Sequence, residues 1–268
     1  MENIKEGWRK RGFVSTYEIA LLNHHSNNEL IELLESKDIV KRTGAATILG
    51  QRKAVDATSS LCEALQKEKA LYTKIAISEA LGNMGIISVK ELIPLLGEIG
   101  KNQHTKLPNK PFEKWNYPLP RDIAARAIVK IGEQALAPIL ERITTMQMVS
   151  LSEAIDAIGY ISYYNVTKIA LQPMLKLLDI FKNNDLIVWK IIRCLQSFPS
   201  TDSEKKLEHF MIYHNQPAIR WEAARSLGQI CNKAPDSLML VKNDNNPFVR
   251  KMCEMARNHI LKKNQKLN

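Results

Sequence analysis

The 268-residue sequence predicts an all-α fold, a right-handed α-solenoid built from about seven stacked helix pairs. Two observations lead to this fold class. A short motif recurs along the chain at a nearly constant interval, and apolar residues are spaced as on amphipathic helices. A third observation is that no alternating strand pattern or hairpin turn competes with the helical pattern.

The recurring motif has a basic residue near its start, small residues in its middle, and then an aliphatic residue usually followed by a glycine. The clearest copies are "VKRTGAATILGQRK" from Val40, "YTKIAISEALGNMG" from Tyr72, "PRDIAARAIVKIG" from Pro120 and "IRWEAARSLGQIC" from Ile219. The equivalent positions, which lie 32, 47, 30, 37 and 32 residues apart, are Gly50, Gly82, Val129, Gly159, Gln196 and Gly228. We infer a period of about 31 to 32 residues with one large and one small insertion.

Each repeat contains two helices. The first half has apolar residues at helical spacing, as in Ile75, Ile77, Leu81 and Met84, and it closes in a glycine-containing turn. The second half repeats the pattern in "SVKELIPLLGEI", "EQALAPILERI" and "IALQPMLKLLDIF". Prolines lie near the starts of these second helices, where a missing N–H is tolerated. Alanine pairs in the first helices allow neighbouring helices to approach closely.

The repeat register gives the expected domain organisation. We expect a flexible N-terminal segment at 1–12, a single repeat array at 13–260 with an inserted loop at 101–119, and a basic C-terminal tail at 261–268. The insertion replaces a short connection between two repeats. Its prolines and aromatic residues indicate an extended segment that packs on another surface.

The motif, best seen at 120–140 and 219–231, resembles HEAT-like repeats of the phycobilisome-lyase (PBS-lyase) type. The resemblance implies a curved solenoid whose second helices line a concave surface. It also implies that the chain is a binding scaffold, because such repeats serve mostly in binding and only occasionally as enzymes.

Composition limits the classes of partner. The formal net charge of +10 and the pI of about 9.4 favour a partner with an acidic surface, and leave nucleic acid open as an alternative. No apolar run is long enough to span a membrane and no secretory signal is evident, so we expect a cytoplasmic protein. The four cysteines lie far apart and are expected to be buried reduced thiols. No metal-ligand or cofactor motif is present.

Enzymes that share the repeat carry characteristic site residues, and these can be looked for in the sequence. The HEAT-like deoxyhypusine hydroxylases hold two irons with His-Glu dyads, and this sequence has no His-Glu dipeptide. The alkylpurine DNA glycosylases of HEAT-like type remain an alternative, because they use tryptophans, an aspartate and an arginine. Asp122 is expected to pair with Arg126 at i and i+4, and Asp156 lies in a repeat that lacks the basic residue, so neither indicates a general base.

Two tryptophans occupy the same repeat position and each precedes an arginine by four residues: Trp189 with Arg193, and Trp221 with Arg225. On a helix each guanidinium can lie over its indole. The pairs form either an exposed patch for phosphates and bases or a buried ladder between repeats. A second recurring feature is the basic column of Arg42, Lys74, Arg121, Arg220 and Arg250, which is expected to bond across the seam between repeats, with phosphate binding as the alternative.

The sequence therefore predicts a non-enzymatic scaffold that binds a macromolecule, most simply a protein, through its concave face and the 101–120 loop. The alternatives are a nucleic-acid-binding protein and a toxin-neutralising or adaptor protein in a bacterial assembly; the oligomeric state stays open. No catalytic, metal or cofactor residue is assigned. The candidate partner-binding residues are Lys106, Lys110, Phe112, Lys114, Trp115, Tyr117, Arg121, Trp189, Arg193, Trp221 and Arg225.

Overall fold

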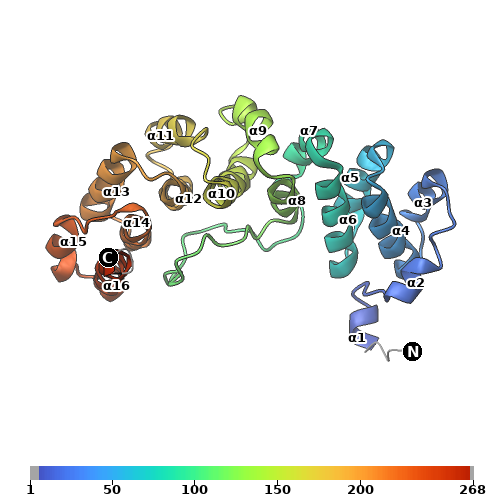
Figure 1. Cartoon of the computed structure of the whole chain (residues 1–268), viewed down its shortest axis with the longest axis horizontal. Helices are drawn as coiled ribbons and strands as arrows, with labels where there is room; N and C mark the ends of the chain where they lie inside the picture. The colour runs from blue at the N-terminus through green and yellow to red at the C-terminus, as the bar shows by residue number, and fades with distance from the viewer. Residues whose placement is uncertain (1–5, 266–268) are drawn as a thin grey trace. The chain divides into compact units, whose positions relative to one another are not determined.

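The computed structural model describes residues 6–265, and over this range the chain consists of helices and their connections, without a strand (Figure 1). The predicted all-α class is confirmed. Contacts divide the chain into two compact units. Unit 1 contains the chain up to Gln103 together with Pro120–Ala154, and unit 2 contains His104–Leu119 together with the chain from Ile155.

Unit 1 holds the first half of the helix series. Its helices are α1 (Glu6–Arg9), α2 (Thr16–Ala20), α3 (Asn27–Leu33), α4 (Ile39–Arg52), α5 (Thr58–Lys67), α6 (Leu71–Met84), α7 (Val89–Leu92), α8 (Ile123–Ile131), α9 (Leu136–Arg142) and the start of α10 (Met148–Asn165). Short 3-10 helices in unit 1 are η1 (Val55–Ala57), η2 (Gly85–Ser88), η3 (Ile93–Leu95) and η4 (Gly132–Ala135).

Unit 2 holds the rest of α10 and the helices after it. These are α11 (Leu171–Ile180), α12 (Asp185–Cys194), α13 (Thr201–Tyr213), α14 (Pro217–Ile230), α15 (Ser237–Leu240) and α16 (Pro247–Gln265), with the 3-10 helices η5 (Leu195–Ser197) and η6 (Val241–Asn243). In chain order, α2 to α15 make seven successive pairs within the described residues, and α16 follows them. The predicted number of about seven helix pairs is confirmed.

Local sequence signals explain where several helices begin. Ser26 caps α3 in a capping box with Glu29, because each side chain bonds the other residue's backbone N–H. Asn184 caps α12 by accepting from the N–H of Ile187. Pro217 begins α14, where a missing N–H costs nothing.

Within each unit, the first helices of successive pairs pack closely against one another. In unit 1 these are α4, α6 and α8, and in unit 2 they are α12, α14 and α16. Glycine makes the close approach possible: a Cβ on Gly50 would lie 2.6 Å from the Cα of Ala80, and one on Gly228 would lie 2.9 Å from the Cβ of Ala256. Larger residues at these positions would hold the helices apart.

The second helices contact one another much less, as α5 and α7 do in unit 1 and α13 and α15 do in unit 2. A stack of helix pairs bends toward the row that is more closely packed. Within each unit the first helices therefore form the inner row, which is visible for α12, α14 and α16 in Figure 1. The expectation that the second helices line the concave side is therefore wrong. The small residues of the first helices allow close packing, and this packing also sets the direction in which the stack bends.

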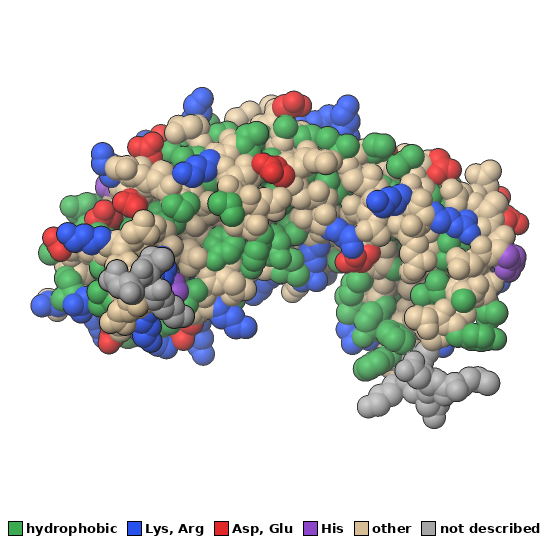
Figure 2. All heavy atoms as spheres, viewed as in Figure 1, with side chains coloured by type: hydrophobic (Ala, Val, Ile, Leu, Met, Phe, Trp, Pro, Cys, Tyr) green, Lys and Arg blue, Asp and Glu red, His purple; other side chains and the backbone are tan. Residues whose placement is uncertain are grey.

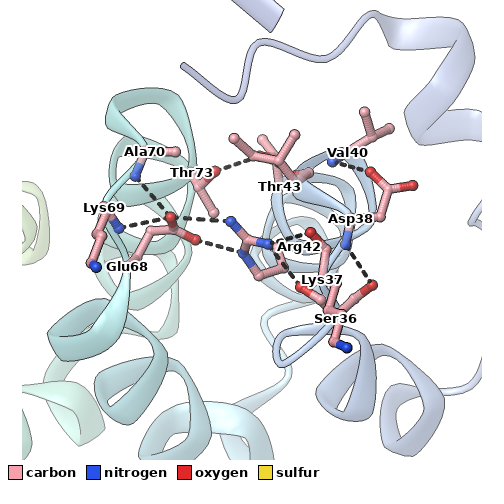
Figure 3. Close-up of polar contacts among 11 residues, drawn as sticks. Ser36, Lys37, Asp38, Val40, Arg42, Thr43, Glu68, Lys69, Ala70 and Thr73 are labelled. Carbon is pink, nitrogen blue, oxygen red and sulfur yellow. Dashed lines mark hydrogen bonds and ion pairs between the residues drawn. The ribbon is translucent and has the colours of Figure 1, made fainter. Parts of the chain in front are cut away.

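The basic column bonds across the seam between repeats, as Figure 3 shows for Arg42. The guanidinium of Arg42 on α4 donates from Nε to Glu68 Oε2 at 2.8 Å and from Nη1 to the carbonyl of Ser36 at 2.7 Å. Glu68 precedes α6, and its Oε1 accepts from the N–H groups of Lys69 and Ala70, both at 2.8 Å. One arginine thus joins the turn before its own helix to the start of the next first helix.

Unit 2 repeats this arrangement. Arg220 on α14 donates from Nε to Asp244 at 2.7 Å and from Nη1 to the carbonyl of His214 at 2.8 Å. Asp244 precedes α16 and accepts from the N–H of Asn246 at 2.8 Å. The expectation that the column bonds across the seam is confirmed for Arg42 and Arg220.

Arg121 departs from the column. The insertion ends in Pro118 and Pro120, and α8 begins only at Ile123, so Arg121 precedes the helix and is exposed. Arg126 takes the equivalent helical position and donates to the carbonyl of Pro120 at 2.8 Å. The expected Asp122–Arg126 pair is therefore wrong: Asp122 is buried and caps α8, accepting from Gly97, Gln103 and Ala125.

Replacing Arg42 with methionine is expected to lower the free energy of unfolding by about 1–3 kcal/mol, because Glu68 loses its partner while its side chain stays 5% exposed. Burial favours a raised pKa for Glu68, but Arg42 and two backbone N–H groups outweigh burial and lower it. This contribution to stability is present above the ordinary pKa and is lost as pH falls. Chemical denaturation measures the change. The neighbouring exposed Lys41→Met is the control, and an equal loss in both variants contradicts the seam role of Arg42.

At both ends of the described range, helix reaches further than the sequence predicts. Helix α1 lies within the segment predicted to be flexible, and residues 261–265, predicted as tail, continue α16; residues 1–5 and 266–268 lie outside the described range. The four cysteines are buried and unpaired as predicted, and burial raises the pKa of Cys62 to about 12. No helix within residues 6–265 has the length and apolarity needed to cross a membrane.

Candidate partner-binding site

The inserted loop packs on unit 2 as an extended strap. We call residues His104–Leu119 the strap; they contain no helix, and Pro108, Pro111 and Pro118 remove backbone donors and favour extended backbone. The strap contacts all the first helices of unit 2: its His104 ring meets Trp189 of α12 edge-on, with the ring centroids 5.0 Å apart.

Trp115 joins the strap to the last two first helices. Its indole stacks on the ring of His259 in α16, with the centroids 4.0 Å apart and the planes 10° from parallel. The same indole reaches α14, where a Cβ on Gly228 would lie 2.8 Å from the Cζ3 atom of Trp115. Gly228 therefore provides space for both Ala256 and the strap.

Tyr117 anchors the other end of the strap on α10. Its side chain is 1% exposed and packs directly over Gly159, where an added Cβ would overlap the phenol. The rings of Tyr160 and Tyr163 surround it, with centroids 6.3 and 5.9 Å away. The glycine that elsewhere admits a neighbouring helix here admits a tyrosine of the strap.

Polar contacts hold the strap backbone along its length. Arg225 on α14 donates from Nη1 to the carbonyl of Lys114 at 3.1 Å. The hydroxyls of Tyr163 and Tyr164 donate to the carbonyls of Trp115 and Tyr117, both at 3.3 Å. At the tip, Glu113 pairs with Lys251 of α16 at 2.8 Å. The strap is thus fixed by side chains from α10, α14 and α16.

A row of buried charges lies in the first helices beneath the strap. Lys190 pairs with Asp156 at 2.9 Å, joining α12 to α10. Glu222 on α14 accepts from Nη2 of Arg193 at 3.3 Å and from Nε of Arg225 at 2.8 Å. All five side chains are almost completely buried. Such groups are stable in a protein interior only when they are paired, so the cluster ties α10, α12 and α14 together.

The environment keeps Glu222 ionised. Burial favours a raised pKa, but the guanidinium groups of Arg225 and Arg193 outweigh burial and hold the pKa of Glu222 below its ordinary value. A lowered carboxyl pKa stabilises the fold above the ordinary pKa, and this stabilisation is lost as pH falls. Burial raises the pKa of Tyr117 well above its ordinary value, so its phenol stays neutral.

The two predicted Arg–Trp pairs differ in the structure. Arg193 lies over the indole of Trp189 at 3.9 Å, as expected from their i and i+4 spacing. Arg225 lies instead over the ring of Phe112, at 5.4 Å, while Trp221 meets Phe248 edge-on. The second pairing is therefore wrong, because the strap supplies a competing aromatic ring. Trp189 is 0% and Trp221 is 3% exposed, so neither indole presents a stacking surface for a base.

The remaining predicted site residues lie in two places. Three strap lysines, Lys106, Lys110 and Lys114, are exposed, whereas Phe112 and Trp115 are half-buried against unit 2. Arg121 is exposed in unit 1 and is not grouped with the strap. The structure thus brings the strap residues together with Arg193 and Arg225, and leaves three lysines at the surface above them.

Sequence reasoning missed Lys190 and Glu222 and set Asp156 aside. A signal was present in the repeat register: positions 153, 190 and 222 align, and they read Glu, Lys and Glu. The aligned positions 156, 193 and 225 read Asp, Arg and Arg. Charges at positions that face neighbouring helices must be paired there, so two adjacent columns that carry both signs predict ion pairs between them.

The comparison with known families bears on this same half of the chain. A family model described as HEAT repeats matches residues 171–257. Residues 171–257 contain HEAT repeats. The prediction of a HEAT-like repeat protein is confirmed for this segment, which runs from α11 into α16. No curated protein matches the chain. HEAT repeats generally mediate interactions between proteins, which is consistent with a binding role for this half of the molecule.

Proposed function

We propose that this chain is a non-enzymatic HEAT-repeat protein that binds a protein partner with an acidic surface through the strap and the first helices beside it. The observation that supports this most directly is that the strap has two kinds of side chain with different surroundings. Its aromatic side chains pack against the helices of unit 2, whereas Lys106, Lys110 and Lys114 are exposed to solvent. A charged segment held in place before binding loses little conformational entropy when a partner docks.

Charge is the second support. The chain carries ten more basic than acidic side chains, so an acidic partner is favoured over a basic one during encounter. Trp189 and Trp221, which were candidates for stacking on bases, are buried, and this favours a structural role over contact with nucleic acid. The proposal therefore names a protein as the partner.

A pull-down from native extract tests the proposal, with nuclease-treated and untreated samples run side by side. We expect a protein to be retained in both samples and to be lost when Lys106, Lys110 and Lys114 are all replaced by glutamate, because the positive surface of the strap is reversed. The matched control replaces Lys176, Lys182 and Lys205, which are exposed elsewhere in unit 2, by glutamate. Loss of the partner on nuclease treatment, or equal loss in both variants, rejects the proposal.

A further inference from the structure

A second surface of unit 2 combines a groove with an excess of positive charge. The groove, of about 550 Å³, lies between α15 with η6 on one side and α16 on the other. Leu238 and Cys253 are buried at its base, and Met239, 45% exposed, forms part of its wall. It therefore offers apolar surface that water reaches.

Charged side chains line the same groove. They are Lys242, Arg250, Lys251 and Arg257, against a single acid, Glu254. Lys251 is paired with Glu113, and Arg250 donates to the carbonyl of Asp244. Lys242 and Arg257 are exposed and have no ion-pair partner among residues 6–265. A helix face that only contacts solvent can carry charges of both signs. The excess of positive over negative side chains beside apolar surface therefore indicates a ligand that is acidic and partly apolar.

We infer that this groove binds an acidic, extended peptide segment of a protein partner. Arg250 and Arg257 are seven residues apart on α16, about 10.5 Å along the helix axis. In a polyproline II segment, residues three apart lie on the same side and about 9 Å apart. Two carboxylates at that spacing match the two guanidinium groups, and an apolar residue between them meets Met239 and the base of the groove.

The charge arrangement favours a peptide over a nucleic acid strand. Glu254 lies in the groove one turn before Arg257, where a continuous phosphate backbone would meet its carboxylate. A peptide can place an apolar side chain there instead. None of the three exposed strap lysines lines this groove, although Glu113 of the strap pairs with Lys251 at its edge. Figure 2 shows Lys and Arg side chains around the end of unit 2 that holds α15 and α16.

Fluorescence anisotropy with purified full-length protein tests the inference. The probe is a short fluorescein-labelled peptide that repeats Glu-Pro-Leu, which favours polyproline II and places a carboxylate at every third residue. We expect Lys242→Glu with Arg257→Glu to weaken its binding about tenfold, because the ion pair at Arg257 is lost and two positive charges of the groove become negative. Neither side chain has an internal partner, so thermal melting of this variant should match that of the unmodified protein.

The control variant Lys176→Glu with Lys205→Glu carries the same change in net charge, and it should bind the probe normally. Equal weakening in both variants, or no binding of the probe by the unmodified protein at low salt, overturns the inference. So does a labelled oligothymidine that binds more tightly than the peptide and is released by the groove substitutions. The strap variant with three glutamates should still bind the probe, so this result and the pull-down fail independently.

Discussion

Replacing Glu222 with alanine is expected to lower the free energy of unfolding by about 3–5 kcal/mol, the largest electrostatic effect in unit 2. The substitution removes the carboxylate that Arg193 and Arg225 share, and the cost of an incompletely paired buried charge far exceeds the value of the pair itself. Glu222→Gln keeps nearly the same volume, so a similar loss in that variant assigns the effect to charge. Denaturant titration followed by circular dichroism measures both changes.

The matched control is an exposed ion pair in the same unit. Asp179 pairs with Lys206 at 2.9 Å, but its side chain is 70% exposed. Asp179→Ala should therefore change stability by less than about 1 kcal/mol. If the Glu222 and Asp179 variants lose the same amount, the buried cluster does not hold the first helices together and the reading of its pairing is wrong.

Replacing Tyr117 with alanine is expected to release one end of the strap and to cost about 3–5 kcal/mol, because a fully buried aromatic ring is removed from its place over Gly159. Trypsin should then cut after Lys106 and Lys114 faster than in the unmodified protein, whereas Lys110 is followed by Pro111 and is a poor site in both. Limited proteolysis followed by mass spectrometry detects this change separately from global unfolding.

Two further tyrosine variants sharpen the result. Tyr213 is 70% exposed, so Tyr213→Ala should alter stability by no more than about 0.5 kcal/mol. The hydroxyl of Tyr117 has no hydrogen-bond partner among the described residues, so Tyr117→Phe should be neutral or slightly stabilising. Rapid cleavage of the strap in Tyr117→Phe would show that the ring does not anchor it.

The helix pairs and the position of the insertion could be predicted from the sequence because both depend on a local period. Apolar spacing and glycine-containing turns act within a few residues, and the strap appears as an interruption of that period. The hydrogen bonds of Arg42 and Arg220 across the seam could also be predicted, because a basic residue recurs at that one position of the repeat. The departure at Arg121 was not, because Pro120 removes the first turn of α8.

Contacts between distant segments could not be predicted in the same way. Arg225 was expected over Trp221 from helix geometry alone, but Phe112 lies more than a hundred residues earlier and takes that place. The first helices form the inner row because Gly50 and Gly228 let their neighbours approach closely. The distance between neighbouring helices cannot be predicted from the repeat motif alone. The pairing of Lys190 with Asp156 requires knowledge of which helix faces meet.

The strap also sets an order of events during synthesis. The chain passes between the two units at Gln103, at Leu119 and again at Ala154, so unit 2 is built from two separate stretches of sequence. Its earlier stretch leaves the ribosome long before its binding surface exists: Glu113 and Lys251 are 138 residues apart. Until α16 is made, Trp115 lacks the ring of His259 on which it stacks. Unit 2 therefore cannot finish folding before almost the whole chain has been translated, and a fragment that starts at Ile155 would lack an integral part of its own core.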